Sequence, residues 1–569
     1  MLGLKRTGRL GRRAGLGLLP LMTLVLAACG SVDQQAAPGA GGVGSAGSAA
    51  TGGAGTVTPM GTASQVGVVT LRRLNRTEYG NTLRDLTGTT TDYGANFPPE
   101  NLSFGFDNIG EALTVQPLHI ELYEQSAEAV LNDLFARPAA DPLRARTLAC
   151  DPSAGRACIV QTLVSFAQYA YRRPVLEAEI SGLADIAQDF AATGGTASDG
   201  LKLALKGVLL SPHFIYRVEL DAEPTSKEPH RVSGFELASR LSYYFWSTMP
   251  DQTLLLEAQH GTLTADAGLT AQIERMLSDP RASALVSNFV GQWLNLRRTD
   301  LVKPDYTIFP TFDDELRASL RTESEQFFSE LLQKGRPISE LLTGTFTYVN
   351  QRLATHYGLP APAGSGFQRV ELAGTPRLGF LTQASFLTAT SNPTRTSPVK
   401  RGKWVLDQLL CSPPPPPPPG VDSAAVDVGA ASVRQRLEQH RAKEPCRSCH
   451  AVMDPIGLSF ENFDGIGVYR AQDQYGPIDA TGTLPTAAGD VSFLGASELV
   501  PILAKDERLA NCVAEKVLTY AVGRGFTGAD QATFKVITDA TTASGKGFRS
   551  LFTSVAVSEA FRSRRAVGE

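Results

Sequence analysis

The sequence lacks the features that would identify a nucleic-acid-binding protein or a common soluble enzyme. Its 53 Lys and Arg residues do not exceed its 57 Asp and Glu residues, and the net charge is -4, so no basic excess is present to bind a phosphate backbone. It contains no P-loop, no GxGxxG, no HExxH and no GxSxG at a strand-to-helix turn. Patterns typical of β-strands are sparse. We therefore expect no nucleic-acid partner and no active site of these familiar kinds.

The first 29 residues have the layout of a bacterial export signal. Five basic residues within the first 15 precede an apolar run over about 16–28, which is too short for a stable membrane span. The run ends in Leu26-Ala27-Ala28-Cys29, which resembles the lipobox of bacterial lipoproteins, so Cys29 is the expected lipid anchor. Gly30 favours the outer membrane, because an inner-membrane retention signal usually has Asp there. A plain signal peptide and, from Arg12-Arg13, a twin-arginine route are the alternatives.

Residues 30–65 are dominated by Gly, Ala, Ser and Thr and contain almost no charge. Such a segment cannot bury enough apolar surface to fold, so we expect a flexible tether between the lipid and the globular body. The remaining roughly 500 residues are enough for several domains. The whole chain has 42% hydrophobic and 19% charged residues, a composition that is ordinary for a soluble protein.

Cys446-Arg447-Ser448-Cys449-His450 is a C-x-x-C-H run of the kind that attaches c-type haem. The two thiols can form thioethers to the haem vinyl groups, and the histidine is then placed to ligate the iron. Only one such run exists, which predicts one covalent haem per chain. A CxxC disulfide, half of a zinc site and coincidence are the alternatives; zinc would need about two more ligands, and no second CxxC or HxxxH follows.

The seven cysteines divide into groups. With Cys29 assigned to lipid and the CxxCH pair to haem, an even remainder of four in an oxidising compartment predicts two disulfides. Cys150 and Cys158 flank a turn-rich hexapeptide that can bring its ends together, so we expect them to pair. Cys411 then pairs with Cys512. Buried free thiols are the alternative for each pair.

Most of the body has apolar residues at helical spacing, which predicts an all-α architecture. Breaks are expected at Arg172-Arg173-Pro174 and at Asp279-Pro280, and Thr396-Ser397-Pro398 begins a helix that runs to Leu410. The predicted helical segments are about 113–136, 158–171, 199–219, 233–246, 266–296, 316–332 and 432–443.

Pro413 to Pro419 is an unbroken run of seven prolines. It predicts a polyproline II rod of about 20 Å, at roughly 3.1 Å per residue. We interpret it as a semi-rigid spacer that marks the main domain boundary; a PxxP binding site is the alternative.

Five groups of residues follow one another along the chain in a recognisable order. They are 71–79 with Asn81, Arg84, Asp85 and 105–108; 166–174; 210–219 and 240–246; the proline run, the CxxCH and 461–464; and Glu515, Lys516, 518–521, Gly523 and Arg524. In this order they resemble the exported multi-module proteins of planctomycete-type bacteria, built from domains of unknown function 1587, 1595, 1592, 1588 and 1585. The resemblance implies a cytochrome-like module around the CxxCH and says little about activity.

These signals give a domain scheme of a signal, a tether and five helical modules. The boundaries are 1–29 for the signal, 30–65 for the tether, 66–137, 138–220 and 221–350 for the first three modules, 351–480 for the proline-rod and CxxCH module, and 481–569 for the last module.

His450 is the expected iron ligand, with its second ring nitrogen held by a carbonyl or carboxylate. Met453 lies on the same side of the haem and is a poor sixth ligand; Met249 and Met276 have no feature that recommends them. His440 and His356 are expected to pack rather than ligate. Other expected roles are propionate pairing or plain surface exposure for Arg447 and Arg470, helix capping for Asp313-Asp314, and loop hydrogen bonding rather than catalysis for Glu461 and Asp464.

Three functions fit these observations. The leading hypothesis is a lipid-anchored monohaem c-type protein of the cell envelope that passes single electrons to a protein redox partner. The second is a haem enzyme of peroxidase or oxygenase type. The third is a non-redox surface scaffold or ligand-binding lipoprotein whose CxxC is structural.

Overall fold

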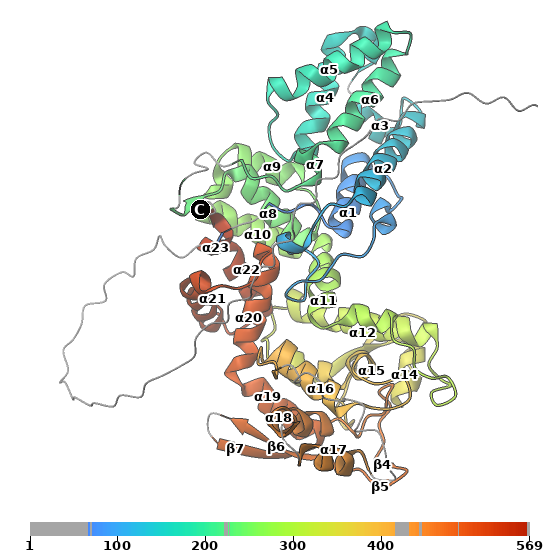
Figure 1. The fold of residues 1–569 in the computed structure, drawn as a ribbon, viewed down its shortest axis with the longest axis vertical. Helices are drawn as coiled ribbons and strands as arrows, with labels where there is room; N and C mark the ends of the chain where they lie inside the picture. The colour runs from blue at the N-terminus through green and yellow to red at the C-terminus, as the bar shows by residue number, and fades with distance from the viewer. Residues whose placement is uncertain are drawn as a thin grey trace, which may run out of the picture. The chain divides into compact units, whose positions relative to one another are not determined.

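The computed structural model describes residues 67–68, 71–148, 150–220, 226, 228–415, 432–442, 446–486 and 489–565. The predictions for the export signal, Cys29, the tether and most of the proline run lie outside these residues. Within them the chain folds as helices joined by irregular connections, and the prediction of an all-α architecture is confirmed (Figure 1). In the same ranges, no helix has both the length and the apolarity to cross a bilayer.

Of the first seven helices, all except α3 contribute apolar side chains to one core. α1 begins after Asn75, whose side chain accepts from the backbone N–H of Glu78 while the Glu78 carboxylate accepts from the backbone N–H of Asn75. Tyr79, Leu83 and Leu86 then fall on one buried face. α4, α5 and α6 lie side by side (Figure 1). The bounds are α1 Arg76–Thr87, α2 Pro117–Ala136, α3 Pro142–Thr147, α4 Arg156–Ala170, α5 Glu177–Ala192, α6 Ala197–Leu210 and α7 Pro212–Ile215.

The predicted helix over 199–219 is too long. α6 ends at Leu210, because Ser211 precedes a proline and adopts an extended backbone that caps the short α7. Residues after α7 continue as extended chain, and the backbone of Tyr216 pairs with that of Arg73. The segment therefore ties the second module to the first.

A second, larger core joins the middle and the end of the chain. It takes apolar side chains from helices that are up to some 300 residues apart in the sequence, including α8, α10, α12, α16, α18, α20 and α22. The bounds of this part are α8 Gly234–Trp246, α9 Gln252–Gln259, α10 Asp266–Ser278, α11 Gly291–Trp293, α12 Asp314–Gln333, α13 Glu340–Thr343, α14 Gln351–Tyr357, α15 Ala384–Ala389, α16 Pro398–Trp404, α17 Val433–Arg441, α18 Cys446–Leu458, α19 Gly495–Lys505, α20 Glu507–Val522, α21 Gln531–Ala543, α22 Phe548–Val557 and α23 Glu559–Arg562.

Two predicted helix boundaries are confirmed in this part. The segment over 266–296 breaks after Ser278, where Asp279 caps a short turn that begins with Pro280. Ser397 caps α16, which continues as a π-helix over Val405–Leu409. The other short helical turns are the π-helix Leu285–Val290 and the 3-10 turns Tyr93–Asn96, Gly110–Ala112, Pro152–Ala154, Thr262–Thr264, Pro280–Ala282, Leu296–Asp300, Phe380–Thr382 and Gly528–Asp530.

Strands contribute only two-stranded antiparallel ladders in the described ranges. The most informative is β1–β8, which pairs the start of the third module with the last described strand of the chain. The ladders are β1 His230–Arg231 with β8 Ser563–Arg564, β2 Phe346–Val349 with β3 Gln368–Glu371, β4 Gln472–Asp473 with β5 Gly476–Pro477, and β6 Thr481–Thr486 with β7 Gly489–Leu494.

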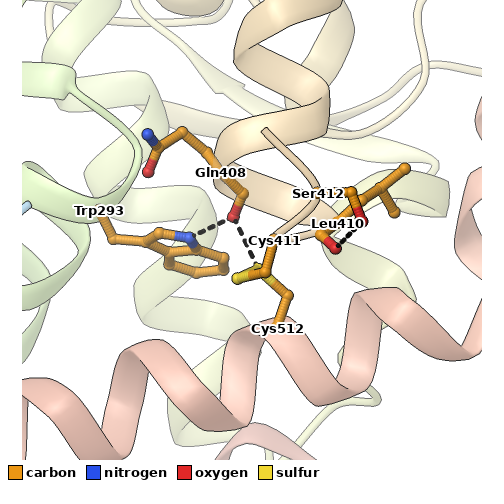
Figure 2. The surroundings of a disulfide bond; sticks show 6 residues. All are labelled: Trp293, Gln408, Leu410, Cys411, Ser412 and Cys512. Atoms are coloured by element: carbon orange, nitrogen blue, oxygen red, sulfur yellow. Dashed lines mark hydrogen bonds between the residues drawn. A yellow bond between two sulfur atoms is a disulfide. The ribbon is translucent and has the colours of Figure 1, made fainter. Parts of the chain in front are cut away.

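Both predicted disulfides are present. Cys150 bonds to Cys158 across the turn between α3 and α4, and Cys411 bonds to Cys512 on α20. The second bond closes a sequence separation of 101 residues. Beside it, the indole N–H of Trp293 donates to the carbonyl of Gln408 at 2.8 Å (Figure 2). The chain before the proline run is thereby fixed to the last module.

The prediction that the proline run marks the main domain boundary is wrong. α16, before the run, crosses α18, after it, with the two backbones in contact. A Cβ added at Gly402 would lie 2.0 Å from the carbonyl oxygen of Met453, and one added at Gly457 would lie 1.8 Å from that of Pro398. Only glycine at both positions allows this approach. The helices on the two sides of the proline run therefore pack directly on each other.

Candidate functional site

The CxxCH residues form the first turn and a half of α18. Cys449 and His450 lie three and four positions after Cys446, and this spacing puts all three side chains on one helical face. Cys446 and Cys449 are partly exposed free thiols. The sulfur of Cys449 is 3.8 Å from the carbonyl oxygen of Pro415. This face thus presents two thiols and an imidazole together.

The C-terminal part of α18 anchors the turn in the main core. Met453 and Ile456 are buried members of that core, and Gly457 makes the close contact with α16. Met453 is on the same helix as His450 and three positions later, so the two side chains share a face. The prediction that Met453 is a poor sixth ligand stays a prediction.

His450 is oriented by a buried carboxylate. Its Nδ1 lies 2.9 Å from Oδ1 of Asp454, one helical turn later. A carboxylate only accepts, so Nδ1 carries the proton and the other ring nitrogen, Nε2, faces away from Asp454. The side chain of Asp454 is 0% exposed and that of His450 is 14% exposed. A carboxylate behind a ligating imidazole fixes the tautomer and raises the basicity of the free nitrogen.

The second carboxylate oxygen of Asp454 differs from the first, which bonds to His450. Its Oδ2 is buried and has no hydrogen-bond partner among the described residues. The residues present therefore fit an iron-ligating histidine: two thiols on one face, an imidazole with Nε2 available, and a carboxylate that holds Nδ1. In the described part of the chain, no group of three or more His, Cys, Asp or Glu side chains could itself hold a metal ion.

The structure brings His440 to His450. Their ring centroids are 4.7 Å apart, with the rings at 73°. The two rings thus pack edge to face. The prediction that His440 does not ligate iron stays a prediction.

His356 lies in the body, where its Nε2 is 2.8 Å from the carbonyl oxygen of Ile466. It is buried, and burial lowers its pKa. The hydrogen bond agrees with the predicted packing role. His356 and the CxxCH histidine thus have different surroundings.

The loop after α18 is held by charged groups that the sequence had singled out. Asp464 accepts from the backbone N–H groups of Ile466 and Val468 at 2.9 and 2.8 Å, and Glu461 accepts from the hydroxyl of Thr396 at 2.8 Å. Arg470 lies 3.5 Å from the Glu461 carboxylate. Burial raises the pKa of Glu461, with Arg401 opposing the shift. Hydrogen bonding is thus the role these side chains play in the structure.

No sequence motif singles out Arg401, which also holds this loop. It is fully buried, and its guanidinium donates to the carbonyls of Phe460, Phe463 and Asp464 at 2.7, 3.0 and 2.8 Å. It also lies 3.6 Å from Glu461. Arg401 is on α16, before the proline run, so this helix supplies the hydrogen bonds that hold the loop after α18.

The predicted helix cap at Asp313 is confirmed. Its carboxylate accepts from the backbone N–H of Leu316, at the start of α12.

Comparison with known protein families supports this modular order. Five family models match the chain. Each is described as a protein of unknown function, and the order agrees with the predicted multi-module architecture. The matches are DUF1587 over 72–136, DUF1595 over 158–219, DUF1592 over 232–359, DUF1588 over 377–473 and DUF1585 over 489–561.

The DUF1588 match contains both α16 and the CxxCH helix, so it includes the proline run within one module. This agrees with the packing of α16 on α18. No curated protein and no solved structure matches the chain.

Proposed function

We propose that the chain is an exported c-type monohaem protein that passes single electrons to a protein partner in the cell envelope. The observation that carries the proposal is the CxxCH on one face of α18, with His450 Nδ1 held by Asp454 and Nε2 left available. The matching family model is named PSCyt3, which is in keeping with a cytochrome-like module. When bound, haem c would supply reversible one-electron chemistry.

The residues of the chain have separate tasks in this proposal. Cys446 and Cys449 would hold the haem covalently, and His450 would ligate its iron. Asp454 keeps the imidazole in one tautomer and one orientation. The close approach of Gly402 and Gly457 to the facing backbones would hold α18 on the body and so limit movement of His450.

A redox titration of protein matured in a host with c-type haem machinery tests the function. We expect a reversible one-electron couple, a low-spin spectrum and little reaction with peroxide. A high-spin spectrum with rapid peroxide turnover would support a haem enzyme instead and would contradict electron transfer as the main role.

The proposal also places the protein at a membrane, through lipid on Cys29 and most simply at the outer membrane. A single lipidated cysteine carrying several acyl chains gives stable anchoring. Cys29→Ser should therefore move the protein from the membrane fraction to the soluble fraction, whereas Ser31→Ala, two residues later, should not. Membrane association that survives Cys29→Ser would contradict the anchor.

A further inference from the structure

A small cavity lies where four parts of the chain meet. Its volume is about 70 Å³, and it is lined by residues that follow the tether, by the end of the second module, by α8 and by the end of the last module. Four of the lining residues are arginines and one is a glutamate: Arg72, Arg217, Arg240, Arg564 and Glu219. The remaining wall is apolar and includes Val522 and Phe561.

The single carboxylate is already neutralised. Arg240 holds Glu219 with two parallel hydrogen bonds of 2.6 and 2.7 Å, and its remaining nitrogen donates to the carbonyls of Phe561 and Ser563. Arg564 donates to the backbone carbonyl of Glu219 at 3.0 Å. The pKa of Glu219 is lowered although burial alone would raise it, because Arg240, Arg564 and Arg72 outweigh the burial. The lining therefore carries an excess of positive charge.

Arg217 is the side chain that this network leaves incomplete. It is 9% exposed, and its guanidinium lies over the ring of Tyr243 at 4.9 Å from the centroid. Its Nη1 is buried and has no acceptor among the described residues. A buried guanidinium N–H without an acceptor is costly, and the side chain that has this unused donor is also one that lines the cavity.

We infer that this cavity binds a small oxyanion, a carboxylate or a phosphate group, with Arg217 as its principal ligand. Guanidinium groups bind both kinds of oxyanion through two parallel hydrogen bonds. A water needs about 10 to 15 Å³ of such space, so the cavity admits a group about five waters in size. The apolar wall leaves room for a short hydrocarbon substituent on a carboxylate. This inference is independent of the haem proposal.

Binding would join parts of the chain that are far apart in the sequence. Arg72 lies just before α1, Arg217 follows α7, and Val522 ends α20. An anion held between them adds a contact that only the assembled fold can make. We therefore expect the ligand to raise the melting temperature as well as to bind.

Calorimetric titration of the full matured chain with sodium phosphate, acetate and butyrate, at equal ionic strength, tests the site. We expect saturable binding of one anion per chain for at least one of the three. Arg217→Gln should weaken that binding by about tenfold or more, which corresponds to about 1.4 kcal/mol. Arg275→Gln is the matched control, because it removes the same charge from an arginine that lies over Trp246, away from the cavity.

A second variant keeps the test decisive if Arg217→Gln does not fold. Val522→Phe fills the cavity without changing any charge, and it should abolish binding. Stronger binding of butyrate than of phosphate would assign the site to carboxylates, and the reverse would assign it to phosphates. The inference is overturned if none of the three anions binds saturably, if Arg275→Gln weakens binding as much as Arg217→Gln, or if Val522→Phe leaves binding unchanged.

Discussion

Two fully buried acidic side chains, in different regions of the molecule, differ in how many of their carboxylate oxygens have hydrogen-bond partners. Glu323, on α12 in the body, is 0% exposed, and both its oxygens are used: Oε1 accepts from Thr347 and Oε2 from Tyr357, each at 2.6 Å. Asp454, on α18, is also 0% exposed, but one oxygen holds His450 and the other has no partner in the described residues.

The difference lies in what each acid positions. The partners of Glu323 make further contacts within the core. The Tyr357 hydroxyl also accepts from the backbone N–H of Ala384, and Arg377 lies over the Tyr357 ring. Asp454 instead positions a partly exposed imidazole whose second nitrogen remains available. A closed network of this first kind stabilises a fold, whereas a network that ends on an available ligand atom is what a cofactor site requires.

The largest effect is expected at the CxxCH, on haem attachment, and not on the stability of the helical body. Replacing Cys446 and Cys449 together by Ser should remove all covalently attached haem, because no thioether can then form. The melting temperature of the body should change little, since both cysteines are partly exposed and only Cys449 packs against the edge of the core. Haem staining after denaturing electrophoresis measures the first effect and circular dichroism the second.

Ser448→Ala, within the same turn, is the control and should retain haem. If the double variant kept covalent haem, the attachment would have to lie elsewhere.

A large change in stability is expected at Glu323. Glu323→Ala should lower the free energy of unfolding by about 2 to 4 kcal/mol, because two buried hydroxyls lose their acceptor and a cavity forms. Glu325→Ala, two positions later on the same helix, should cost within about 1 kcal/mol, since it removes a half-exposed ion pair with Arg321. Denaturant unfolding followed by circular dichroism measures both. Equal losses in the two variants would refute the structural role of the buried acid.

The pH dependence of the unfolding free energy tests the protonation of the buried Glu323. Burial raises the pKa of Glu323 from 4.5 to about 7, although the bonds from Thr347 and Tyr357 oppose the shift. The folded protein therefore binds this proton more tightly than the unfolded chain does. The resulting stability is fully present below about pH 4.5 and is lost as the pH rises through 7, by up to about 3 kcal/mol.

Glu323→Gln cannot titrate, so the difference in unfolding free energy between wild type and variant should change with pH over this window. Taking the difference removes the parallel contribution of Glu78, whose pKa burial also raises to about 7. A difference that stays constant from pH 4.5 to 7.5 would show that Glu323 is ionised throughout.

The smallest effect is expected from Asp454→Asn. Asparagine keeps the shape and the acceptor for His450, so the stability of the body should change by only about 1 kcal/mol or less. The lost negative charge should raise the reduction potential of attached haem, by roughly 60 mV if it corresponds to a tenfold change in the one-electron equilibrium. Asp490→Asn, on the exposed strand β7, makes the same charge change and should shift the potential much less. Equal shifts would show that Asp454 acts only through net charge.

Local patterns predicted much of this molecule from the sequence. The helices, the caps at Asp313 and Ser397 and the short disulfide all depend on residues that are close in the chain. The carboxylate behind His450 was expected in kind, but Asp454 was not named, even though its spacing of four residues on a helix was a usable signal. The β6–β7 hairpin was missed because Thr481–Thr486 contains Gly and Pro, and it forms against α18.

The rest depends on contacts that no local pattern encodes. Thr347 and Tyr357 reach Glu323 from 24 and 34 residues away, and Arg72 and Arg564 line one cavity from opposite ends of the body. The proline run indicated a spacer, yet tight glycine contacts join the helices on both sides of it. Such pairings are set by the folded core and not by spacing in the sequence.

The central claim is that α18 carries one covalently attached haem. The most direct test is a pyridine haemochrome spectrum, together with the intact mass, of protein matured in a host with c-type haem machinery. We predict a c-type spectrum, one haem per chain and a mass increase of one haem that survives denaturation. A chain of unmodified mass, with Cys446 and Cys449 as free thiols or joined to each other, would contradict the claim.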